Sequence, residues 1–125
     1  MPSNIVFYDL DSFFVLGAKA LLDTFDPIYI AATQRDVIEL VKTQSIDILI
    51  IDPSQSIWII SEDFLASVRS VSEKTKIVFL IESKNKSNFY INRLCPHLVI
   101  EKNIEPALFV KILKLLNIGI CANKI

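Results

Sequence analysis

The feature that most constrains this chain is the run Ile48–Ile51, four large aliphatic residues followed directly by Asp52 and Pro53. A strand with no polar side on either face is typical of a parallel sheet covered by helices on both sides. Pro53 ends the strand because proline has no N–H to donate. Open α/β sheets build their sites at the carboxyl ends of the strands. Asp52 is therefore either part of a functional site or the cap of a loop.

The composition indicates one cytoplasmic domain. A chain of 125 residues buries about two thirds of its unfolded surface, and 52% hydrophobic residues with a mean hydropathy of +0.46 suit a largely buried sheet. No apolar run approaches the roughly 18 residues of a membrane span, and no basic segment precedes the first apolar run. Cys95 and Cys121 lack metal-ligand spacing, so we expect reduced thiols.

Charge is balanced overall and uneven along the chain. The net charge of −1 gives no electrostatic footprint for nucleic acid. Residues 1–63 carry a net charge of −7 and residues 64–125 a net charge of +6. This split is either ordinary surface variation or a dipolar surface that favours a charged partner or head-to-tail contacts.

Alternating patterns predict an α/β fold. Apolar runs predict five strands, at residues 4–8, 28–31, 46–51, 77–81 and 98–100. Helical spacing predicts five helices, at about 11–23, from Thr33 onward, at 61–71, at about 89–94 and at 106–116. This alternation implies one doubly wound parallel sheet with right-handed crossovers, most simply the flavodoxin-like order 2-1-3-4-5. That order places Asp9 and Asp52 at the ends of adjacent strands.

Four sequence features occur together in a recognisable order. Asp9 follows the first strand, the segment Leu16–Leu22 lies within the first predicted helix, Asp52 ends the third strand, and Lys102 precedes Pro106 by four residues. In this order they resemble the receiver domain of two-component response regulators, particularly those ahead of a LuxR-type helix-turn-helix domain.

The resemblance covers residues 4–116 and implies a CheY-like fold. It places Asp52 at the phospho-acceptor position, Asp9 at the first of two consecutive acids, and Lys102 at the lysine that contacts the phosphoryl group. We therefore expect a receiver-like domain over residues 1–116, with residues 117–125 as a tail or the start of a linker.

Three positions depart from the family pattern. The second acid, a direct Mg²⁺ ligand in the family, is Leu10, and the hydroxyl residue that closes the fourth strand is Ile81. The aromatic switch residue of the fifth strand is Val99. Mg²⁺ needs hard oxygen ligands, and phosphoryl transfer depends on positioning and charge neutralisation. We therefore expect no metal, no cofactor and no catalytic residue.

The acids after the first and third strands each have two interpretations. Asp11 is either the N-cap of the first helix or a substitute metal ligand. Asp52 is either a loop acid or part of a remnant acidic pocket made of Asp9, Asp11, Asp52 and Lys102. In such a pocket Lys102 holds the carboxylates ionised and takes over the structural role of the ion.

These observations favour a degenerate receiver, a non-enzymatic regulatory module that acts without phosphorylation. It would be the N-terminal part of a transcription regulator that contacts DNA only through an output domain outside these residues. The alternatives are a working receiver phosphorylated on Asp52 by a histidine kinase and a flavodoxin-like ligand-binding protein. The latter is disfavoured because two glycines cannot build a glycine-rich phosphate loop. His97, the single histidine, is interpreted as structural.

The last helix is apolar around more than the ~100° stripe of a one-sided surface helix. We expect the apolar side chains beyond that stripe to be exposed. They would pair the module with itself or with another receiver-like regulator, as a homodimer or a heterodimer. The expected interaction residues are Leu108, Ile112, Leu113 and Leu115. The competing interpretation is that these side chains pack under the tail through Ile118 and Ile120.

Overall fold

The computed structural model describes residues 4–8, 28–52, 62–81, 94 and 96–117. The strands are β1 (Ile5–Tyr8), β2 (Ile28–Ile30), β3 (Ile48–Ile51), β4 (Lys76–Ile81) and β5 (Leu98–Glu101). The helices within the described residues are α2 (Gln34–Thr43), α3 (Glu62–Val71) and α5 (Pro106–Asn117). The helices predicted at about 11–23 and 89–94 lie outside the described residues, except for Leu94.

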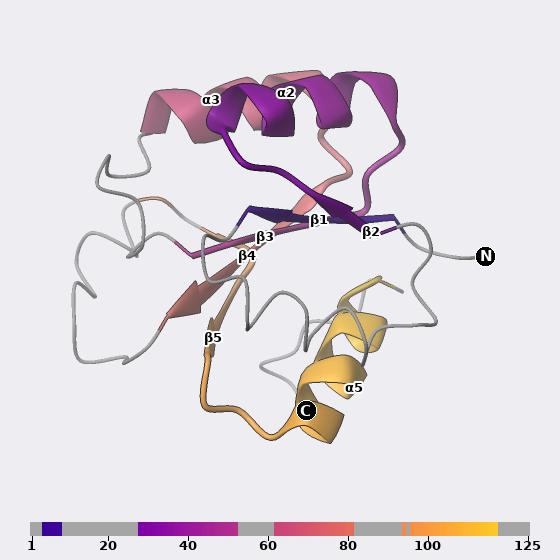
Figure 1. The fold of residues 1–125 in the computed structure, drawn as a ribbon, viewed down its shortest axis with the longest axis vertical. Helices are drawn as coiled ribbons and strands as arrows, with labels where there is room; N and C mark the ends of the chain where they lie inside the picture. Colours follow the sequence, from indigo (N-terminus) through magenta and orange to yellow (C-terminus); the bar gives the residue numbers. More distant parts are fainter. Residues whose placement is uncertain (1–3, 9–27, 53–61, 82–93, 95, 118–125) are drawn as a thin grey trace.

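The sheet has the predicted topology. Its five strands are all parallel and lie in the order β2-β1-β3-β4-β5. Helices α2 and α3 cover one face and α5 covers the other (Figure 1). The flavodoxin-like, CheY-like fold predicted from the sequence is thereby confirmed.

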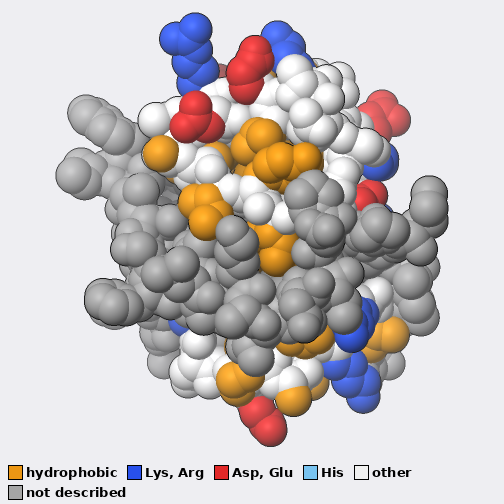
Figure 2. Space-filling model, turned by 45° about the vertical axis from the view of Figure 1, so that its right-hand side comes forward, with side chains coloured by type: hydrophobic (Ala, Val, Ile, Leu, Met, Phe, Trp, Pro, Cys, Tyr) orange, Lys and Arg blue, Asp and Glu red, His pale blue; other side chains and the backbone are white. Residues whose placement is uncertain are grey.

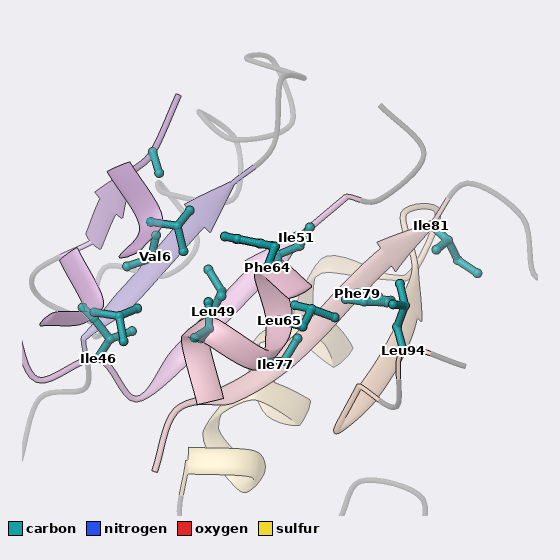
Figure 3. Close-up of a cluster of buried hydrophobic side chains, with 14 residues drawn as sticks. Val6, Ile46, Leu49, Ile51, Phe64, Leu65, Ile77, Phe79, Ile81 and Leu94 are labelled. Atoms are coloured by element: carbon teal, nitrogen blue, oxygen red, sulfur yellow. The ribbon is translucent and has the colours of Figure 1, made fainter. Parts of the chain in front are cut away.

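Two hydrophobic clusters cover the two faces of β3. Leu49 and Ile51 pack into a first cluster beneath α2 and α3, parts of which appear in Figure 3. Ile48 and Ile50 pack into a second cluster beneath α5. All four side chains have no exposed surface. The prediction of a central strand buried on both faces is confirmed, and this strand carries Asp52 at its carboxyl end.

The amino edge of the sheet is fixed by polar contacts. Asp47 accepts a hydrogen bond from the backbone N–H of Asn4 at 3.0 Å and forms an ion pair with Lys74 at 3.2 Å. β3 therefore begins at Ile48 rather than at Ile46 as predicted. Ile46 is nevertheless fully buried, and its carbonyl accepts a hydrogen bond from the hydroxyl of buried Thr75 at 2.7 Å.

Helix α2 begins with the predicted Thr33 cap. The Thr33 hydroxyl accepts a hydrogen bond from the backbone N–H of Asp36 at 3.1 Å. The Asp36 carboxylate in turn accepts from the N–H of Ala32 at 3.3 Å, rather than from Thr33 as a capping box would have it. Thr33 and Asp36 therefore still satisfy backbone N–H groups at the helix start, but the Asp36 carboxylate binds the N–H of the residue before the N-cap. None of the described helices is long and apolar enough to cross a membrane.

Candidate functional site at the carboxyl edge

The central feature of the carboxyl edge is a buried ion pair between Asp52 and Lys102. The Nζ atom of Lys102 lies 2.6 Å from Oδ2 of Asp52. The Asp52 side chain has no exposed surface, and the Lys102 side chain is 10% exposed. The structure thus brings together the two described members of the predicted acidic pocket, 50 residues apart in sequence.

Backbone pairing of the strands places these two side chains. The N–H of Asp52 donates to the carbonyl of Tyr8 at 3.3 Å, and the N–H of Lys102 donates to the carbonyl of Ile81 at 2.7 Å. Asp52 lies two positions after Ile50, and Lys102 lies two positions after Ile100; both isoleucines pack beneath α5. Asp52 directly follows the end of β3 and Lys102 directly follows the end of β5, so both lie at the carboxyl edge of the sheet. Because β4 lies between β3 and β5, the ion pair spans the width of one strand.

Each of the two buried charges is tolerated only because the other is next to it. Removing two charges from water costs several kcal/mol for each ion, and their attraction in the low-dielectric interior offsets that cost when the geometry is close. At 2.6 Å the ammonium supplies the positive charge that a buried carboxylate requires. The Asp52 carboxylate is thereby paired with a cationic side chain of its own chain.

The other predicted pocket residues are distributed differently. Asp9, Leu10 and Asp11 lie outside the described residues. Ile81 belongs to the first cluster with Leu94, and both lie at its β4 and β5 end, away from α2 (Figure 3). Val99 is half-buried against the same cluster. Ile81 and Val99 therefore contribute to the first hydrophobic cluster rather than to the ion pair. Among the described ranges, no group of three or more His, Cys, Asp or Glu is placed to hold a metal ion.

Tyr8 is a residue at this edge that the sequence interpretation did not single out. Its ring packs edge-on against Phe64 of α3, with the ring centroids 6.1 Å apart. Burial raises the pKa of the Tyr8 hydroxyl, and a hydrogen bond with Gln34 partly opposes that rise. Tyr8 therefore stays protonated and connects β1 to both helices of its face. In the sequence, Tyr8 could have been singled out because it directly precedes Asp9 at the end of the first strand.

The predicted interaction surface on α5 needs one correction. Leu113 is fully buried in the second cluster, so its prediction as a surface residue is wrong. Leu108 is 43% exposed, and Ile112 and Leu115 are half-buried. Phe109, Leu113 and Leu116 face the sheet at helical spacing because they lie on one side of the helix.

Leu108, Ile112 and Leu115 therefore form an apolar ridge on the flank of α5, in which Leu108 is exposed, Leu115 is half-buried and Ile112 packs against the second cluster. These positions have the spacing i, i+4, i+7 along the helix. Lys111 and Lys114 are exposed on the same helix. In Figure 2, hydrophobic side chains lie next to Lys and Arg side chains at the lower end of the molecule, where Figure 1 places α5. The competing packing through Ile118 and Ile120 falls outside the described residues.

Comparison with solved structures identifies the same fold in response-regulator receivers. A response regulator from Thermotoga maritima is similar with a TM-score of 0.79 and 16% identity, over 95% of this chain and 100% of that one. A CheY-like receiver domain from Methanospirillum hungatei has a TM-score of 0.76 and 16% identity, over 99% and 98%. A LuxR-family DNA-binding response regulator from Silicibacter pomeroyi has a TM-score of 0.72 and 16% identity, over 94% and 93%. No protein-family model and no curated protein matches the sequence.

Proposed function

We propose that this chain is a receiver-like regulatory module that acts without aspartyl phosphorylation, by pairing with a second receiver-like domain through α5. The observation that carries the proposal is the Asp52–Lys102 ion pair. The carboxylate at the phospho-acceptor position is fully buried, with an ammonium 2.6 Å away.

The chemistry of phosphoryl transfer explains why this observation matters. An acceptor carboxylate must present an oxygen to the phosphodonor, while Mg²⁺ neutralises the charge that develops. Asp52 is instead enclosed and already paired with Lys102. Leu10 stands where the family pattern has a metal-binding acid, which removes an oxygen ligand that Mg²⁺ would use. Asp52 serves as a structural anion in this proposal.

Intact-mass measurement with a small phosphodonor tests this part of the proposal. The purified chain is incubated with acetyl phosphate and millimolar Mg²⁺, beside a working receiver as positive control and Asp52→Asn as the matched variant. We expect no mass gain in this chain. A gain of one phosphoryl group that Asp52→Asn abolishes would establish the working receiver instead.

The pairing part rests on the ridge of Leu108, Ile112 and Leu115. In this ridge an exposed leucine, Leu108, adjoins two half-buried apolar side chains, and exposed apolar surface on a small domain often marks an interaction site. The similarity to a LuxR-family DNA-binding response regulator supports a place in transcription control. DNA contact would come from an output domain outside these residues.

Light scattering over a concentration series tests the pairing. The average mass of the wild type should rise with concentration, and Leu108→Glu should abolish the rise. Ala66→Glu is the control, because Ala66 is equally an exposed helix residue but lies in α3, across the sheet from α5. A wild type that stays monomeric at high micromolar concentration and recovers no receiver-like partner in a pull-down contradicts the pairing.

A further inference from the structure

We propose that His97 is a pH-sensitive clasp, which holds the amino end of β5 to β4 while its ring is neutral and releases it on protonation. Two hydrogen bonds connect His97 to Ile77. The backbone N–H of His97 donates to the Ile77 carbonyl at 2.9 Å. The backbone N–H of Ile77 donates to Nδ1 of the His97 ring at 3.0 Å.

The second hydrogen bond depends on the protonation state of the ring. A ring nitrogen accepts a hydrogen bond only when it carries no proton, so the neutral ring of His97 has its proton on Nε2. Protonation places a second proton on Nδ1 and turns the acceptor into a donor. The Ile77 N–H then faces another N–H, and this hydrogen bond is lost.

The surroundings favour the neutral ring. Burial lowers the pKa of His97 below its ordinary value of 6.5, and the positive charges of Lys76 and Arg69 lower it further. Lys76 begins β4 directly before Ile77, and Arg69 lies in the last turn of α3. Arg69 also donates to the Leu94 carbonyl at 2.9 Å, so the chain before β5 has a second attachment that does not titrate near neutral pH.

The direction of the pH effect follows from the lowered pKa. Above pH 6.5 the ring is neutral in both the folded and the unfolded chain, and the contribution of the clasp is complete. As the pH falls from 6.5 toward the lower folded pKa, the unfolded chain binds the proton more readily, so the native state loses stability. The clasp opens once the folded ring itself is protonated. Opening begins at the amino end of β5, which His97 directly precedes.

Nitrogen-15 NMR of the full chain tests the clasp. His97→Asn is the matched variant, because the asparagine Oδ1 lies about where Nδ1 does and accepts at every pH. We expect the Nε2–H tautomer at pH 7.5. The protection of the Ile77 amide against hydrogen exchange, corrected for the intrinsic rate, should fall about fivefold as His97 titrates, the loss of one hydrogen bond. In His97→Asn the protection should not change with pH.

Three results would overturn the clasp: an Nδ1–H tautomer at pH 7.5, an unchanged Ile77 protection across the His97 titration, or the same fall in His97→Asn. The first two come from the wild type alone, so they decide the matter even if the variant does not fold. None of them involves Asp52 or α5, so the clasp and the proposed function fail independently.

Discussion

Replacing Lys102 with methionine keeps the bulk of the side chain and removes its charge from the buried pair. At 2.6 Å and an effective dielectric constant of ~20, the attraction between the ammonium and the carboxylate is about 6 kcal/mol. Most of that attraction offsets the desolvation of the two ions, so the intact pair contributes little net stability. The loss of one partner is costly, because the remaining charge keeps its desolvation penalty. Breaking such a pair typically costs about 3–5 kcal/mol.

Protonation sets a ceiling on this cost and makes it depend on pH. A buried carboxylate that loses its cation can bind a proton instead of remaining charged. For an aspartate with the ordinary pKa of about 3.9, binding a proton at pH 7 costs about 4 kcal/mol, and at pH 5 about 1.5 kcal/mol. The destabilisation caused by Lys102→Met should therefore be near 4 kcal/mol at pH 7 and should shrink as the pH is lowered to 5.

Urea unfolding followed by far-ultraviolet circular dichroism measures this effect. With a slope of about 2 kcal/mol/M, the midpoint should fall by about 2 M at pH 7. Lys111→Met is the control, because Lys111 is an exposed lysine of α5 and its loss should change stability by less than about 0.5 kcal/mol. The double variant Asp52→Asn with Lys102→Met should be more stable than Lys102→Met alone, since neither charge remains.

Two outcomes contradict this account of the carboxyl edge. If Lys102→Met is as stable as the wild type at pH 7, the lysine does not neutralise Asp52 in solution. If the destabilisation is large but equal at pH 5 and pH 7, it comes from lost packing of the lysine stem rather than from its charge.

Three further substitutions test the packing, the capping and the electrostatics. Leu113→Ala should lower the free energy of unfolding by about 2–5 kcal/mol because Leu113 is fully buried, whereas Leu108→Ala should lower it by about 1 kcal/mol or less. The urea unfolding midpoints of the two variants measure this difference. Thr33→Ala removes the N-cap acceptor of α2 and should cost about 1 kcal/mol in the same assay. Lys76→Gln removes a positive charge that lowers the pKa of His97, so an NMR titration should give a higher pKa than in the wild type; a lower one contradicts the assignment.

The strand pattern and the central pair could be predicted from the sequence because each depends on local rules. In a run such as Ile48–Ile51 neither side of the strand is polar enough to face solvent, so helices must cover both sides. Once the strand order follows from alternation, the carboxyl ends of β3 and β5 lie at one edge. An acid and a lysine directly after those strands then fall within reach of each other, as Asp52 and Lys102 do.

The parts that the sequence could not provide depend on tertiary context. Large apolar residues cover more of the α5 circumference than one buried stripe, so periodicity could not tell buried Leu113 from exposed Leu108. The hydrogen bond from Ile77 to the His97 ring depends on where β5 begins relative to β4, which no sequence spacing encodes. The roles expected for Asp9 and Asp11 stay predictions, since both residues lie outside the described part of the chain.

The position of the ion pair has a consequence for the interaction ridge. Lys102 is four residues before Pro106, and the segment between them leads from β5 into α5. The N–H of Ile104 within it donates to the carbonyl of Glu101 at 3.1 Å, so this turn is tied to the end of β5. An ion pair that fixes Lys102 over β4 therefore also fixes the point from which α5 starts. In the proposed function this turn also sets the position of Leu108 in the first turn of α5.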